Sequence, residues 1–204
     1  MSGESVESLL RQGSGLWRGR EIQLDPGLGI ATGFPALDRH LAGSGWPRGA
    51  ITEIFSDRPG GAMALLMPAL AVLSREEGKQ IVLVAPPYIP YAPGFSLNGV
   101  DLGKLLLVNG RDEKACLWVL EQVLGAGCGA ALCWPQALHR TALRRLQLAA
   151  ERGAAAGFLL CRPQPAAASS PAALRLRVAA AGNRVDILKR RGGWPVEGIE
   201  LTAL

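Results

Sequence analysis

The chain has 204 residues, of which 49% are hydrophobic and 19% are charged, a composition that excludes a disordered chain and favours one globular domain. No apolar run reaches the roughly 18 residues that a membrane-spanning helix needs, and the N-terminal stretch MSGESVESLL lacks the basic and apolar regions of a signal peptide. We therefore expect a cytoplasmic protein without membrane contact. The formal net charge of +5 comes from residues 139–204, where Lys and Arg outnumber Asp and Glu, whereas residues 1–138 are near neutral.

Residues 1–30 predict a partly ordered N-terminal arm, in which a short amphipathic piece is followed by GSGLWRGR and a Pro/Gly turn. Trp17 is a large apolar ring in this loose segment, and such a ring anchors a segment either to a partner surface or to its own domain. A short helix is expected over residues 35–41, before the turn GSGWPRGA.

Short, continuous apolar runs then alternate with longer helical stretches. The runs have the length and composition of strands that are buried on both faces, and they occupy residues 50–55, 80–85, 104–108, 129–134 and 157–161. The helical stretches between them occupy residues 62–77, 113–124 and 136–152. Strands that alternate with helices predict an α/β fold, in which a mostly parallel sheet is flanked by helices.

The C-terminal part follows a different pattern. LRLRVAA and RVDILKRR alternate polar with apolar residues on either side of a turn, which predicts an antiparallel β-hairpin with one face in water. Residues 163–173 form a Pro/Ala/Ser loop before this hairpin. We therefore place the domain at residues 31–191 and expect residues 192–204, which include Trp194, to form a flexible tail.

The stretch ITEIFSDRPGGAMALL has the strand–turn–helix layout of a phosphate-binding loop, whose pattern is G-x-x-x-x-G-K-[ST]. Ser56 stands at the first glycine position, and Gly61, preceded by Gly60, stands at the second. Ala62 replaces the lysine that neutralises phosphate, and Met63 replaces the hydroxyl that ligates Mg²⁺. The loop is therefore degenerate at both positions that carry its charge chemistry.

The carboxylate that would help to hold the metal ion of a bound nucleotide is also absent from its expected position. The apolar run at 129–134 ends in Trp134-Pro135, without the carboxylate that would hold a metal through water. Three charge-assisted interactions are thus missing, which together amount to about 5–9 kcal/mol. Micromolar binding corresponds to about 8 kcal/mol, so we expect millimolar or weaker nucleotide binding, no hydrolysis and no cofactor.

No other catalytic or metal-binding set emerges. The four cysteines lie in apolar stretches without a CxxC pair, as is typical of small buried side chains, and the two histidines stand alone. Asp112 precedes the helical stretch 113–124, where a negative charge stabilises a helix N-terminus. We therefore expect no enzymatic activity.

The function is then expected to lie in surfaces. Helix 136–152 is predicted to present an outer polar stripe of Arg140, Arg144, Gln147 and Glu151, with Arg145 and Arg152 beside it. The predicted hairpin adds six basic side chains, which are Arg175, Arg177, Arg184, Lys189, Arg190 and Arg191. Contact with nucleic acid or with an acidic partner is one interpretation of these residues, and a solvated face is the other.

The loop PPYIPYAPG is a second candidate surface. Its prolines restrict the backbone and lower the entropy that is lost on docking, and exposed rings of Tyr88 and Tyr91 would suit an interface. The alternative is that these rings cap the end of the sheet. Trp194 is a third candidate anchor, on the same reasoning as for Trp17.

Two sets of stretches resemble known families. TGFPALDRHLAGSGWPRGAITEIF resembles the entry to the RecA ATPase core, and the element order that follows is similar up to the basic hairpin. LWRGR, GWPRGAITEI, VAPPYIPYAPG, LWVLEQVL, ALRRLQLAAERG and LKRRGGWP resemble the ImuA family of RecA-like proteins, which is in turn similar to SulA. Where RecA relatives carry a catalytic Glu after the second strand, this chain has Pro86-Pro87, so the resemblance implies a RecA-like pseudo-ATPase.

The resemblance to ImuA implies an accessory role in damage-induced translesion DNA synthesis. The implied partners are ImuB, a catalytically inactive Y-family polymerase relative, an error-prone polymerase and RecA, with weak contact to DNA as a further option. The similarity to SulA leaves an alternative, which is inhibition of cell division by binding FtsZ. A residual nucleotide sensor and direct DNA binding through the basic third also stay open.

Overall fold

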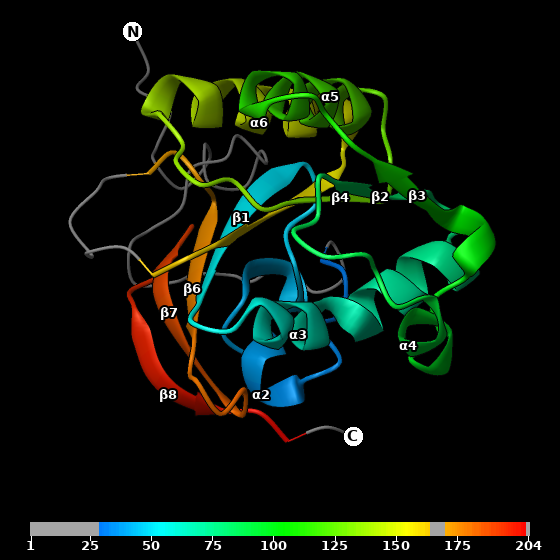
Figure 1. The fold of residues 1–204 in the computed structure, drawn as a ribbon. Coiled ribbons are helices and arrows are strands. Elements are labelled where there is room, and N and C mark those ends of the chain that lie inside the picture. The colour runs from blue at the N-terminus through cyan, green and yellow to red at the C-terminus, as the bar shows by residue number, and fades with distance from the viewer. Residues whose placement is uncertain (1–28, 164–169, 203–204) are drawn as a thin grey trace, which may run out of the picture.

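The structure is a computed structural model that describes residues 29–163 and 170–202 (Figure 1). A single sheet forms its centre, and the strands are β1 Ala50–Ser56, β2 Ile81–Val84, β3 Leu105–Val108, β4 Ala130–Cys133, β5 Ala156–Cys161, β6 Leu174–Val178, β7 Arg184–Arg190 and β8 Val196–Glu200. They lie in the order β3-β2-β4-β5-β1-β6-β7-β8. Neighbours from β3 to β6 pair in parallel, and β7 pairs antiparallel with both β6 and β8. The predicted α/β fold with a mostly parallel sheet and a C-terminal antiparallel hairpin is therefore confirmed.

Helices cover both faces of the sheet. They are α2 Pro35–Asp38, α3 Pro59–Ala71, α4 Ala92–Leu97, α5 Glu113–Gly125 and α6 Arg140–Gly153, with 3-10 turns at Ala42–Ser44 and Leu102–Lys104. Figure 1 shows α5 and α6 together on one face, and α2, α3 and α4 on the other. No helix in the described ranges is long and apolar enough to cross a membrane.

The central strand β1 shows why the apolar runs become strands of a parallel sheet. Six of its seven residues are buried, since helices cover both of its faces. Ile54 packs in the cluster under α3, and Ile51 packs in the cluster under α5 and α6. Full burial of such a side chain stabilises the fold by about 1.5–3 kcal/mol. An uninterrupted apolar run therefore satisfies both layers at once.

Two helix starts differ from the prediction. Helix α3 begins at Pro59, where a missing N–H costs nothing at the first helical position, and it continues through Pro68 into a π-helical turn at Val72–Glu76. Helix α6 begins at Arg140, after the N-cap His139, and not at residue 136. The intervening segment crosses the end of the sheet, where the N–H of Ala137 donates to Glu113 Oε1 (3.4 Å).

The chain end also differs from the expected flexible tail. Residues Val196–Glu200 form β8, which extends the sheet beside β7. Ile199 pairs with Val185 and is 6% exposed, so this strand contributes an apolar side chain to the core. The N–H of Gly198 donates to Asp186 Oδ1 (2.8 Å), which ties the strand to its neighbour a second time. The alternation of only five residues, VEGIE, was too short a signal to predict this strand.

Candidate functional site

The turn between β1 and α3 has the strand–turn–helix order of a phosphate-binding loop but is short, because α3 begins at Pro59, two residues before Gly61. The N–H of Arg58 donates to Ser56 Oγ (3.2 Å), and this hydroxyl donates to the carbonyl of Arg58 (2.8 Å). The turn lies at the carboxyl end of β1, the edge of an open α/β sheet where ligands bind. The sequence predicted this strand–turn–helix layout correctly.

The two residues that replace Lys and Ser/Thr lie in apolar surroundings. Ala62 is 2% exposed and belongs to the core under α3. Met63 follows it and lines an open groove. Gly60 has nothing within 4 Å of the position of an added Cβ, and a Cβ on Gly61 would meet Ser56 Oγ at 3.1 Å. The site of the predicted degenerate loop is therefore partly core and partly groove wall.

The groove has a volume of about 610 Å³ and is mostly apolar. Its walls come from α3, from the loop after β2, from α4 and from the residue that follows β4. Its lining includes Met63, Met67, Tyr91, Phe95 and Trp134. Phe95 is 5% exposed and packs in the core, so the side of the groove formed by α4 is fixed to the sheet.

The loop after β2 forms the rim of this groove. Ala85 has φ 47°, in the left-handed region, and its N–H donates to the carbonyl of Val108 (2.8 Å), so the backbone leaves the sheet at a defined angle. Tyr88, Ile89 and Tyr91 then stand 70%, 93% and 71% exposed. The tyrosines therefore stand at the groove and do not cap a buried sheet end.

A second, more polar pocket of about 660 Å³ adjoins the groove and shares Pro87, Tyr88 and Trp134 with it. Its polar lining residues are Ser56, Asp57, Arg58, Gln136 and Arg162. The two pockets together form one depression over the carboxyl ends of β1, β2, β4 and β5, which we call the edge groove. Its apolar half lies against α3 and α4, and its polar half lies over the carboxyl ends of β1, β4 and β5.

Most basic residues of the predicted hairpin contact the chain itself. Arg175 on β6 pairs with Glu53 on β1 (Nε to Oε2, 2.9 Å) while its guanidinium lies over the ring of Phe55 (5.0 Å to the centroid). Arg177 pairs with Asp186 across the hairpin (3.0 Å). The Glu53–Arg175 pair is nearly buried, with side chains 8% and 11% exposed.

Three further hairpin cations donate to backbone carbonyls or to a carboxylate. Lys189 Nζ donates to Ala172 O (2.8 Å) and to Ser170 O, and burial lowers the pKa of this amine. Arg190 donates to the carbonyls of His40 and Trp194. Their role as interaction residues stays a prediction, as does that of Arg175, Arg177 and Arg191.

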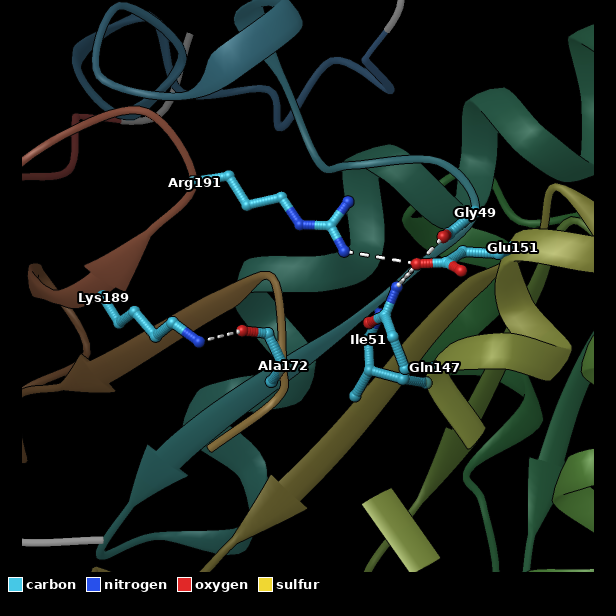
Figure 2. A network of polar contacts seen from close by, with 7 residues as sticks. All are labelled: Gly49, Ile51, Gln147, Glu151, Ala172, Lys189 and Arg191. Carbon is cyan, nitrogen blue, oxygen red and sulfur yellow. Dashed lines mark hydrogen bonds and ion pairs between the residues drawn. The ribbon is translucent and has the colours of Figure 1, made fainter. Parts of the chain in front are cut away.

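Figure 2 shows a network that links Arg191 to the start of β1. Gln147 on α6 accepts a hydrogen bond from the N–H of Ile51 (2.9 Å) and donates to Glu151 Oε1 (2.9 Å) and Gly49 O (3.4 Å). Arg191 Nη2 lies 3.3 Å from the same Glu151 oxygen. The prediction that Gln147 lies on the outer stripe is wrong, because its side chain is 6% exposed and joins the helix to the sheet.

The outer surface of α6 carries the other predicted basic side chains. Arg140 and Arg144 are exposed, and Arg145 pairs with Glu121 on α5. Trp194 is 83% exposed, and Trp17 lies outside the described residues. The structure therefore separates the predicted cations into a hairpin group with contacts inside the chain and an exposed α6 group.

Three of the four thiols lie in surroundings that favour the protonated form. Burial raises the pKa of Cys128 to about 11, and that of Cys133 and Cys161 to about 12, so these thiols stay protonated at neutral pH. Cys116 and Cys133 are buried, as the sequence predicts. Within the described ranges, no three His, Cys, Asp or Glu side chains are grouped so that they could hold a metal ion.

Comparison with known proteins gives relatives over the core of the chain. No family model matches it. ImuA of Caulobacter vibrioides is 34% identical over 139 residues, which make up 65% of this chain and 57% of that protein, so the match spans little more than half the length of this relative. RecA of Chlorobaculum parvum is 28% identical over 125 residues, which make up 61% of this chain and 35% of that protein. RecA of Thermotoga petrophila is 29% identical over 123 residues, which make up 60% of this chain and 34% of that protein.

Among solved structures, SulA from Pseudomonas aeruginosa is 28% identical, with a TM-score of 0.48, over 55% of this chain and 98% of SulA. The sequence matches to ImuA and RecA confirm the resemblance to ImuA that the sequence motifs predicted, and the chain is similar to both proteins over its core.

Proposed function

We propose that this chain is a non-catalytic accessory protein of damage-induced, error-prone translesion DNA synthesis, and that it acts by binding other proteins. The observation that carries the proposal is the edge groove, which lies where a RecA-like protein would hold phosphate. Ala62 is buried in the core and Met63 lines the groove, at the positions where a working loop carries its lysine and its hydroxyl. Neither side chain neutralises phosphate or ligates Mg²⁺.

The shape and composition of the groove support a protein partner. A concave surface of about 610 Å³ lined by methionine, proline and aromatic residues accepts apolar side chains, and methionine adapts to their shape. Tyr88, Ile89 and Tyr91 add exposed apolar area at its rim, and exposed patches of this kind mark interaction sites. The similarity to ImuA supports an ImuB-like protein as the partner, with RecA and an error-prone polymerase as further partners and DNA as a weak contact.

Co-purification of the full chain with an ImuB-like protein from the same genome tests this proposal. We expect a stable complex that forms equally well with and without ATP and Mg²⁺. Titration calorimetry of the full chain with ATP and Mg²⁺ at micromolar concentration is expected to show no heat of binding. A complex that forms only with ATP, or tight ATP binding by the chain alone, would contradict the proposal.

A genetic measurement separates this role from inhibition of cell division. Deletion of the gene is expected to reduce mutagenesis after DNA damage, while division of undamaged cells continues normally. Filamentous growth on overproduction without damage, together with unchanged mutagenesis in the deletion strain, would instead support a SulA-type inhibitor of FtsZ.

A further inference from the structure

The two halves of the edge groove differ in chemistry although they share one wall. The apolar half is lined by Met63, Met67 and Phe95, and the polar half by Arg58 and Arg162. Pro87, Tyr88 and Trp134 line both halves, so one bound chain can pass from one half to the other. The groove therefore presents an apolar surface followed directly by a cationic one.

We propose that the edge groove binds an extended segment of a partner protein in which apolar side chains are followed or preceded by acidic ones. The apolar side chains enter the half between α3 and α4, and the carboxylates meet Arg58 and Arg162. The inference rests on the proposed function, because it identifies the edge groove as the protein-binding site of the accessory protein and states which chemistry the site recognises.

Charge complementarity specifies the acidic part of this segment. Arg58 and Arg162 are both exposed, and neither makes an ion pair within the part of the chain that the structure describes. Guanidinium groups bind carboxylates through two parallel hydrogen bonds, which fixes the orientation of the partner. Asp57 is the one carboxylate among the described lining residues, so the polar half keeps a positive balance.

The apolar half favours a protein segment over a nucleic acid strand. Proteins that hold single-stranded nucleic acid combine stacking rings with cations along the whole path of the phosphates. Here the two arginines are confined to one half. The other half has rings that could stack on bases, from Tyr88, Tyr91 and Trp134, but no Lys or Arg among its lining residues. A phosphate backbone would therefore lose its water there without gaining a cation.

Selection of peptides on the full chain tests the inference without a known partner. A phage-displayed library of random peptides is selected on the wild-type protein, and enriched peptides are synthesised with a fluorescent label for anisotropy titration. We expect enriched sequences that combine apolar residues with neighbouring Asp or Glu. Failure to enrich any peptide, or enrichment without acidic residues, would overturn the inference.

Matched variants locate the peptide on the groove. The double change Arg58→Glu with Arg162→Glu is expected to weaken peptide binding about tenfold or more, because it places like charges opposite each other. Arg140→Glu with Arg144→Glu makes the same change in net charge on the exposed face of α6 and is expected to leave the affinity unchanged. Equal effects of both pairs would mean that only the total charge of the protein matters and would overturn the inference.

A second matched pair tests the apolar half. Ile89 lines the groove and is 93% exposed, so Ile89→Asp can be made without disturbing the core. Leu97 is 86% exposed on α4 and is not a lining residue, so Leu97→Asp is its control. We expect about a tenfold loss of peptide affinity for the first and no change for the second. A loss of peptide affinity in Leu97→Asp but not in Ile89→Asp would mean that the peptide binds outside the edge groove, and it would contradict the inference.

Three further outcomes separate the inference from its alternatives and from the proposed function. A labelled oligo-dT strand that competes with the peptide for the wild-type protein and loses affinity in Arg58→Glu with Arg162→Glu would assign the groove to nucleic acid instead. A complex with an ImuB-like protein that survives all the groove variants would overturn this inference while the proposed function stands. The variants could weaken peptide binding as expected while the wild-type protein fails to bind the ImuB-like partner. That result would contradict the proposed function and leave this inference standing.

Discussion

The edge groove and the hairpin network both contain arginines but place them in opposite surroundings. In the hairpin network, which we define as Glu53, Arg175, Gln147, Glu151 and Arg191, every side chain contacts another part of the same chain. In the edge groove, Arg58 and Arg162 and the rings of Tyr88 and Tyr91 are exposed to solvent. The comparison shows that a high density of arginine in the sequence does not by itself identify a binding surface. An arginine is available to a binding partner only where no group within the fold already pairs with its charge.

The largest effect is expected from breaking the buried pair in the hairpin network. Arg175→Met leaves Glu53 as an unpaired charge that is 8% exposed, and this change is expected to lower the free energy of unfolding by about 3–5 kcal/mol. Urea denaturation followed by circular dichroism measures the change. The double variant Arg175→Met with Glu53→Gln removes both charges and is expected to recover most of the loss. A loss below about 1 kcal/mol in the single variant would show that this pair behaves as a surface ion pair.

The next largest effect tests whether Ala62, in the degenerate loop, is needed for packing of the core. Ala62→Lys places a long charged chain where the core holds a methyl group, so we expect a loss of about 1–3 kcal/mol in the free energy of unfolding and no gain of ATP binding. Gly60→Lys adds the same charge two residues earlier, where an added Cβ meets nothing within 4 Å, and is expected to leave stability nearly unchanged. Micromolar ATP binding by the first variant would mean that the loop needs only its lysine to work.

A smaller effect separates the buried and exposed members of the network. Gln147→Leu leaves the N–H of Ile51 without its acceptor, and the expected loss is about 1–2 kcal/mol. Arg191→Ala removes an ion pair whose side chains are 59% and 45% exposed, so its expected loss is below about 1 kcal/mol and disappears at high salt. If both variants lose the same free energy at high salt, the distinction between buried and exposed members is wrong.

The sequence predicted the elements whose pattern depends on local burial. Strand β1 is an apolar run because it lies between two helical layers, and Asp112 caps α5 by accepting a hydrogen bond from the N–H of Ala115 (2.7 Å). Both signals come from a few neighbouring residues. The degenerate loop could also be placed, because its strand, turn and helix are contiguous in the chain.

Features that depend on contacts between distant residues could not be predicted. Gln147 bonds to Ile51, which lies 96 residues away, and only its spacing of four from the buried Leu143 hinted at an inward position. Arg175 finds Glu53 because β6 pairs with β1, and no local pattern reveals that neighbour. The groove likewise joins four separate segments, so its two halves became visible only in the folded chain.

The smallest effect concerns Asp186, which ties β7 both to β8 and to β6. The hydrogen bond from the N–H of Gly198 and the contact with Arg177 lower the pKa of this carboxyl from its ordinary value. Because the pKa is lower in the folded state, the stabilisation is fully present above the unfolded pKa of about 3.9 and is lost as the pH falls through the folded value. Asp186→Asn is therefore expected to cost about 1 kcal/mol near neutral pH and less below about pH 4, measured by urea denaturation across this range. A difference from wild type that stays constant down to low pH would show that the backbone hydrogen bond is indifferent to the charge, and that β8 is held by Ile199 and the strand pairing alone.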